Sequence, residues 1–185
     1  IQLLWAPSET DDVTAVWLPD DGVLFGSAAV ITDIPNVGTP LRTLRDPVRW
    51  ADTLDRLAAL GPRVLVPEFG HPMTEGIDER LRGTAAFLRW MRREVVDRLN
   101  AGMDAVTITH DIDYPEGMFA PPWLSETYGH RDFVVRDIVR SETGWWDGNP
   151  TSLHPSPPRA AAAAVAAAVT DKQAVLRRAR ELRDA

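Results

Sequence analysis

Short apolar segments at the start of the chain predict three β-strands. They lie at residues 1–6 (IQLLWA), 13–19 (VTAVWLP) and 22–30 (GVLFGSAAV). The second and third are joined by Asp20-Asp21-Gly22, and an Asp-Gly pair between apolar runs is a strong signal for the tight turn of a β-hairpin. We therefore expect these two strands to pair as a hairpin.

The next segment predicts a helix followed by a buried strand. Asp46-Pro47 can open a helix, because proline is favoured in the first turn, and Gly61-Pro62 can end it. Between them apolar residues recur at intervals of three and four, as on one helix face: Val48, Ala51, Leu54, Leu57 and Ala58. The apolar run VLVP at 64–67 follows directly. A hairpin, a helix and a buried strand in this order are typical of one half of a layered α/β sandwich.

After Gly76 the pattern changes from strands to helices. Helices are expected at 78–100, 132–142, 160–168 and 170–185. The proline-rich run HPSPP at 154–158 is typical of a linker. We therefore place a boundary near Ser156.

Composition and charge narrow the classes of partner. The chain has 185 residues, 44% of them apolar, so it can bury a sizeable core. Its net charge of −7 gives no basic footprint for nucleic acid, and no apolar run reaches the roughly 20 residues that span a bilayer. We therefore expect neither nucleic acid nor a membrane as a partner. The lack of cysteine excludes disulfides, thiolate nucleophiles and cysteine-ligated zinc, but leaves the compartment open.

Two loops beside predicted strands carry candidate ligands. Glu9, Asp11 and Asp12 lie in SETDD, where a loop can hold carboxylates toward a ligand; a solvated polar turn is the alternative. His71, in EFGHPM after the buried strand, occupies a usual place for a metal ligand, and a structural histidine is the alternative. The other histidines show no H-x-H or H-E-x-x-H spacing, and P-loop, G-x-S-x-G and dinucleotide glycine motifs are lacking. No complete site can be assembled from these residues.

The stretch GWWDGNP at 144–150 combines a turn with two large aromatic side chains. Gly148 can adopt a positive φ, and Pro150 stops a preceding helix. Trp145 and Trp146 are large amphipathic residues, so we expect them in a core, an interface or a pocket wall. Two alternatives stay open: ordinary core residues at a helix end, or rings that fill a seam between sheet and helical parts, one of them lining a substrate pocket.

These motifs occur together in one family. Four runs resemble, in order and spacing, the alkyl sulfatase branch of the metallo-β-lactamase-fold hydrolases: APSETDDVTAVWLPDDGVLFG, IPNVGTPLR, RDPVRWADTLDRLAALGPRVLVPEFGHP and YGHRDFVVRDIVRSETGWWDGNPTSLHPSPP. The resemblance implies an α/β fold, with a partial metallo-β-lactamase αββα sandwich followed by a helical dimerisation segment. The sandwich part would be 1–76, the helical extension and start of the dimerisation domain 77–155, and a linker with a truncated helical segment 156–185.

The resemblance also implies a reaction and an assembly. Alkyl sulfatases of this type cleave sulfate esters of alkyl alcohols with water activated by two zinc ions, and the dimerisation segment implies a homodimer. The H-x-H-x-D-H run that supplies most of the family's metal ligands would lie before Ile1. Because the chain also enters in mid-strand, we expect it to be a piece of a longer protein.

Five positions decide how far the family site carries over to this sequence. Glu9 matches a family metal ligand, whereas Ala28 stands where the acid that bridges the metals is expected, and a methyl group cannot coordinate a metal. Phe69 stands where a histidine ligand belongs, with His71 two residues later as the candidate ligand. Arg42 matches an arginine implicated in holding the sulfate, with a solvated loop charge as the alternative. A catalytically altered homologue that keeps fold and dimerisation is therefore the alternative to an active enzyme, and another metallo-hydrolase chemistry on the same scaffold is a third possibility.

Overall fold

Two units make up the chain in the computed structural model, which describes residues 1–38 and 40–185. The first unit is Ile1–Trp145 and the second is Trp146–Ala185. The boundaries that were expected near Gly76, from the family resemblance, and near Ser156, from the proline-rich run, stay predictions.

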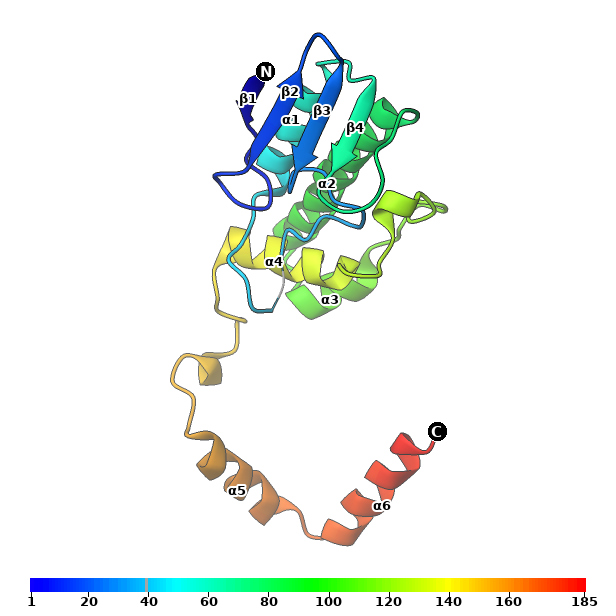
Figure 1. Ribbon diagram of the computed structural model, residues 1–185. Coiled ribbons are helices and arrows are strands. Elements are labelled where there is room, and N and C mark those ends of the chain that lie inside the picture. The colour runs from blue at the N-terminus through cyan, green and yellow to red at the C-terminus, as the bar shows by residue number, and fades with distance from the viewer. Residues whose placement is uncertain (39) are drawn as a thin grey trace. The chain divides into compact units, whose positions relative to one another are not determined.

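A four-stranded sheet lies at the start of the first unit (Figure 1). Its strands are β1 (Gln2–Trp5), β2 (Thr14–Leu18), β3 (Val23–Ser27) and β4 (Val64–Pro67), in the order β1-β2-β3-β4. The first three pair antiparallel and β4 joins β3 in parallel. Gly22 has a φ of 63° in the turn between β2 and β3, so the predicted hairpin is confirmed.

The third strand ends earlier than the apolar pattern predicts. The run was expected to continue to Val30, but β3 stops at Ser27, where the backbone turns and the Val30 amide donates to the Ser27 carbonyl at 3.0 Å. Ala28 and Ala29 are buried in this turn. Their apolar character therefore reflects a buried loop and not a continued strand.

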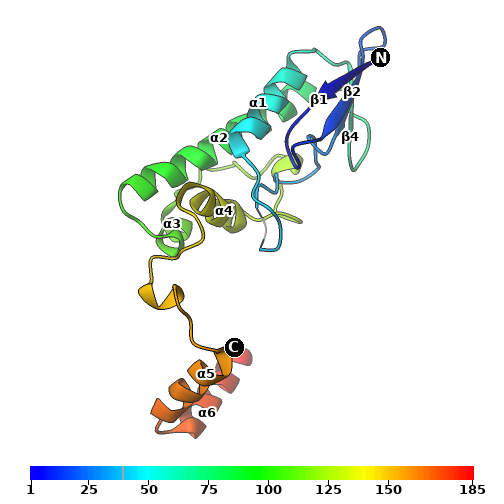
Figure 2. The same cartoon turned by 90° about the vertical axis from the view of Figure 1, so that its left-hand side faces the viewer.

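Two helices cover one face of the sheet. They are α1 (Pro47–Ala58) and α2 (Ile77–Asn100), and both lie on the same side of the sheet in two perpendicular views (Figures 1 and 2). The Asp46 carboxylate caps α1 by accepting from the amides of Val48 and Arg49. The core between helices and sheet contains fully buried side chains from both layers: Leu24, Trp50, Leu54, Leu65, Leu81 and Leu88. The predicted helix, strand and second helix are therefore confirmed in this part, although β4 is fully buried on its helix-facing side alone.

The rest of the first unit is helical. The elements are α3 (Ala105–Asp111), the 3₁₀ turn η1 (Pro122–Leu124) and α4 (Arg131–Thr143). Helices α3 and α4 pack with α2, and Ile108, Val134 and Ile138 are buried in the same core as the sheet residues. Helix α4 was predicted, but α3 was not.

The second unit contains η2 (Pro150–Ser152), α5 (Pro158–Ala168) and α6 (Lys172–Arg183), and none of its residues is buried. The Asp-Gly-Asn turn is confirmed: Gly148 has a φ of 82°, and the Asp147 carboxylate accepts from the Asn149 amide at 2.9 Å. The side chains of Trp145 and Trp146 are 69% and 45% exposed. Within the described residues of this chain neither ring is buried, and both the core and the seam interpretations stay predictions for the full-length protein.

In the part of the chain that the structure describes, no helix combines the length and apolarity that a membrane crossing requires.

Candidate functional site

Glu9 lies in the loop between β1 and β2, at the end of the sheet. This loop is held by Ser8, whose side chain is buried and whose hydroxyl donates to the Ala6 carbonyl at 2.9 Å. The Glu9 carboxylate accepts from Nη2 of Arg45 at 2.8 Å, and Arg45 also donates to the Asn36 carbonyl at 2.5 Å. An arginine therefore engages the residue that was predicted to bind a metal.

Glu68 is a second carboxylate at this end of the sheet, after the opposite edge strand β4. It follows β4 directly, and its amide donates to the Val30 carbonyl at 3.1 Å. Burial, and to a lesser degree the negative charge of Glu9, raise the pKa of Glu68. The loop after β1 and the end of β4 thus bring two acids close enough to influence each other.

The other positions that were expected to mark a metal site do not complete one. Ala28 is buried in the turn after β3, while Phe69 and His71 are exposed in the loop after β4. Across residues 1–38 and 40–185, no group of three or more histidine, aspartate or glutamate side chains is placed to hold a metal ion. Because tetrahedral zinc takes three or four protein ligands, the donors described in this chain do not fit a zinc site on their own.

The arginine that contacts the candidate site is not the one that the sequence indicated. Arg42, the predicted sulfate contact, is exposed. Arg45, three residues later in the same loop, is mostly buried and reaches Glu9. The sequence contains no signal that separates the two, since the path of the loop decides which side chain faces inward.

A hollow of about 580 Å³ lies beside Arg45, at the start of α1. Arg45, Arg49 and Arg92 line it, and each has an acidic partner: Glu9, Asp11 and Glu142 respectively. The planar fork of arginine suits a tetrahedral oxyanion. Here, however, an anion would have to compete with these carboxylates.

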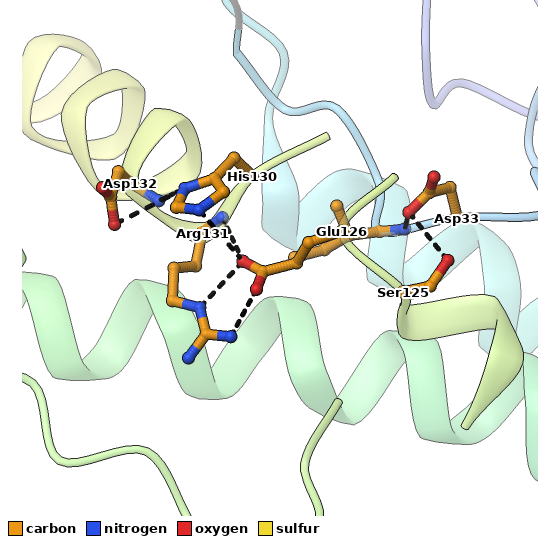
Figure 3. A network of polar contacts seen from close by, with 7 residues as sticks. Asp33, Ser125, Glu126, His130, Arg131 and Asp132 are labelled. Atoms are coloured by element: carbon orange, nitrogen blue, oxygen red, sulfur yellow. Dashed lines mark hydrogen bonds and ion pairs between the residues drawn. The ribbon is translucent and has the colours of Figure 1, made fainter. Parts of the chain in front are cut away.

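A polar network around Asp33 fastens the loop before α4 (Figure 3). The buried Asp33 carboxylate accepts from the amides of Ile34 and Tyr128, both at 2.7 Å, and from the hydroxyls of Ser125 at 3.3 Å and Thr127 at 2.5 Å. It therefore joins two segments that are more than ninety residues apart. The sequence contains no signal for this role, because an isolated aspartate in a loop has no distinctive pattern.

Glu126 and Arg131 complete this network at the start of α4. Glu126 accepts from the backbone amide and the Nε of Arg131, both at 2.8 Å, and from its Nη2, as Figure 3 shows. The guanidinium of Arg131 also lies 3.7 Å from the ring centre of Phe119, a cation–π contact. His130 caps the helix, since its Nδ1 accepts from the Asp132 amide. These contacts assign His130 a structural role.

Asp137 is a buried acid on α4. Its Oδ2 has no hydrogen-bond partner among the described residues, and the carboxylate lies so close to Gly38 that any side chain there would collide with it. Burial raises the pKa of Asp137 to about 6, while the charges of Arg140 and Arg45 act in the opposite direction. Asp137 is therefore an electrostatic neighbour of the arginine that holds Glu9.

Comparisons with known proteins agree on one group. Residues 105–185 match the family described as alkyl sulfatase dimerisation. A linear primary-alkylsulfatase from Pseudomonas sp. is 34% identical over 165 residues, which cover 85% of this chain and 31% of that protein. The solved structure of a stereoselective inverting sec-alkylsulfatase from Pseudomonas sp. matches with a TM-score of 0.88 at 24% identity, over 98% of this chain and 30% of that one.

A more distant match supports the wider fold. A metallo-β-lactamase family protein from Thermus thermophilus matches with a TM-score of 0.50 at 22% identity, over 77% of this chain and 44% of that one. The chain spans about a third of the length of the alkylsulfatases that it matches. By sequence the chain is similar to alkylsulfatases over most of its length, and its fold is that of a solved alkylsulfatase structure with a metallo-β-lactamase family neighbour, so the resemblance to the alkyl sulfatase branch is confirmed.

Proposed function

We propose that the full-length protein hydrolyses sulfate esters of alkyl alcohols and that this chain forms one side of its active site. The observation that carries the proposal is that Glu9 and Glu68 follow strands that end at the same end of the sheet, in the loops that resemble the family's ligand loops, and that the negative charge of Glu9 contributes to raising the pKa of Glu68. The similarity to alkylsulfatases supplies the reaction type, a sulfatase-type hydrolysis.

The described residues of this chain do not supply the metal ligands of that reaction. The family's chemistry uses zinc to activate water, but the donors described here are Glu9, already paired with Arg45, and Glu68. Ala28 and Phe69 cannot coordinate a metal. We therefore assign no catalytic step to a metal held by this chain. Glu9 remains its one residue that both matches a family ligand and lies at the site, while His71 and Arg42 are exposed.

We also propose a homodimer as the working assembly. Support comes from the match of residues 105–185 to the alkyl sulfatase dimerisation family. The second unit, which this match covers, has no buried residue, although α6 carries the exposed apolar side chains Val175, Leu176 and Leu182. A partner surface would cover such side chains.

A second candidate is a catalytically altered homologue that keeps fold and dimerisation. The Glu9–Arg45 ion pair favours it specifically, because a guanidinium 2.8 Å from the carboxylate competes with any cation for the same oxygens. The substitution of the family's acid by Ala28 points the same way.

One experiment separates the two candidates. The full-length protein is assayed for sulfate release from dodecyl sulfate, and its metal content is measured by elemental analysis. An active enzyme releases sulfate and loses this activity in Glu9→Gln, but not in the control Asp20→Asn, at the exposed turn between β2 and β3. An altered homologue releases no sulfate, with or without Glu9. It binds metal only when Ala28→Asp and Phe69→His are introduced together. A protein that releases sulfate equally well with and without Glu9 contradicts the role given to this loop.

A further inference from the structure

An open hollow with mainly apolar walls lies along helix α2. Its volume is about 560 Å³, and small-molecule sites typically occupy roughly 300–1,000 Å³. The walls include the half-buried side chains of Trp90 and Met118 and the nearly buried side chains of Phe87 and Leu124. None of the lining residues belongs to the candidate site at the end of the sheet.

Two of the aromatic walls are held in place by other rings. The ring of Phe87 meets that of Phe119 edge-on, with 6.0 Å between their centres. The ring of Trp90 lies 5.7 Å from that of Tyr114. Such aromatic pairs fix the orientation of both partners, so the hollow is formed before anything enters it.

Gly83 lines the hollow from the interior of α2. Glycine is among the least favourable residues in a helix interior, because it gives up the most backbone freedom. A Cβ atom at this position would meet nothing nearer than the Trp123 indole nitrogen at 3.9 Å, an ordinary contact distance. The packing of the described residues therefore does not require glycine here, and its missing side chain leaves room in the hollow.

The charged side chains of the lining are Arg89 and Arg93, one turn apart on α2. Arg89 is neutralised by Asp52 and Asp55, both at 2.7 Å. Arg93 is exposed and has no acidic partner among the described residues. The unbalanced charge at the hollow is therefore positive.

This charge disfavours a second copy of α6 as the occupant. Helix α6 has exposed apolar side chains, but it carries five basic residues and one acidic residue. It would bring further positive charge to Arg93. The walls and the charge together fit an occupant that is apolar along its length and negative at one end.

We propose that this hollow binds a single-chain anionic amphiphile, with its alkyl chain over Gly83 and against Trp90 and its head group on Arg93. These three residues follow one stripe of α2, which rises about 15 Å from the first to the last. The planar fork of arginine suits a sulfate, sulfonate or carboxylate head group. Alkyl sulfates belong to this class, but the site goes beyond the proposed function, because it binds the amphiphile without hydrolysing it.

Titration calorimetry of the full-length protein with decyl sulfonate, below its micelle concentration, tests the site. Decyl sulfonate is not a sulfate ester and so cannot be hydrolysed as one. Gly83→Leu fills the hollow and Arg93→Gln removes its charge, and each should weaken one binding event roughly tenfold. The matched control Arg136→Gln, an exposed arginine on α4, should leave it unchanged. Affinity that is unchanged in either hollow variant overturns the proposal, and so does equal binding of decyltrimethylammonium.

Sulfate release by the same variants is a separate readout, because they leave the loops of Glu9 and Glu68 intact. Its absence in the parent protein contradicts the proposed function, whereas unchanged sulfonate affinity contradicts the amphiphile site alone.

Crystals of the wild-type protein with ω-brominated decyl sulfonate give a readout that does not depend on how a variant folds. An anomalous bromine peak over Gly83, beside Trp90, is the expected result. A hollow filled by another segment of the full-length protein or by a second copy overturns the proposal, and so does bromine bound elsewhere alone.

Discussion

The two faces of the sheet differ in how their apolar side chains are covered. Successive residues of a strand point to opposite faces of the sheet, so the neighbours Leu24 and Phe25 of β3 represent one face each. Leu24 is fully buried beneath the helices, whereas Phe25 is 41% exposed. On the open face Phe25 is in register with Val16 and Val66, and Val16 with Leu3, which is 73% exposed.

The difference between the two faces shows which apolar side chains this chain buries with its own residues and which it leaves exposed. Helices α1 and α2 complete the covered face with the chain's own residues. The open face carries an equally apolar row across all four strands, with no described element of this chain to bury it. In an αββα sandwich such a face packs against a second sheet, so we expect the full-length protein to cover it.

The largest expected effects come from truncating these two neighbouring side chains. Leu24→Ala should reduce the free energy of unfolding of the full-length protein by about 3–5 kcal/mol, since it leaves a cavity beneath the helices. If a second sheet covers the open face, Phe25→Ala should cost a similar amount. Urea unfolding of both variants measures the two losses.

A small loss in the second variant would contradict this expectation. If the loss in Phe25→Ala stays below about 1 kcal/mol while Leu24→Ala shows its full loss, the open face is a free surface. The half-sandwich interpretation of this sheet is then wrong.

A smaller loss of stability is expected when the hydrogen-bond network of Asp33 is removed. Asp33→Ala removes the acceptor of four donors and leaves buried polar groups unpaired, so it should cost about 2–3 kcal/mol. Asp20→Ala, at the exposed hairpin turn, is the matched control. Equal unfolding midpoints in urea for the two variants would show that the network does not hold the helical layer to the sheet.

Asp137, which is buried on α4, should make the free energy of unfolding depend on pH. Its pKa of about 6 lies above the ordinary aspartate value, so the folded state binds the proton more tightly, and the stability that this group contributes falls as pH rises from about 4 to 6. Asp137→Asn should therefore raise the free energy of unfolding by about 1–2 kcal/mol at pH 7, and leave it nearly unchanged at pH 4. Unfolding midpoints across this range, compared with Asp132→Asn on the same helix, measure the effect; a constant difference at all pH values would contradict it.

The smallest change in stability is expected at Trp145 and Trp146, where the two units join. These side chains are exposed in this chain, as are the apolar side chains on the open face of the sheet. Trp146→Phe removes one hydrogen bond, from the indole to the Asn149 carbonyl at 3.0 Å, and should change stability by less than about 1 kcal/mol. Trp145→Phe is the matched variant. If both keep the parent's dimerisation and its preference among alkyl chain lengths, the seam-and-pocket interpretation of these rings is wrong.

Local sequence patterns were sufficient to predict most elements of the first unit. The hairpin at Gly22, helix α1 with its Asp46 cap, strand β4 and the long helix α2 all follow from them. A cap, a turn and a periodic apolar stripe each act within a few residues, so they can be recognised without knowing the rest of the fold. The family resemblance likewise rests on contiguous runs and was confirmed.

Which side chains meet became known only from the packed structure. Glu9 pairs with Arg45 and not with Arg42, Asp33 binds a loop more than ninety residues away, and Arg80 is buried among uncharged acceptors. The apolar run also failed to predict the end of β3, because the residues after Ser27 are apolar in a buried turn as they would be in a buried strand. Such contacts depend on the paths of loops between packed layers, and those paths are set by the whole core rather than by any short stretch of sequence.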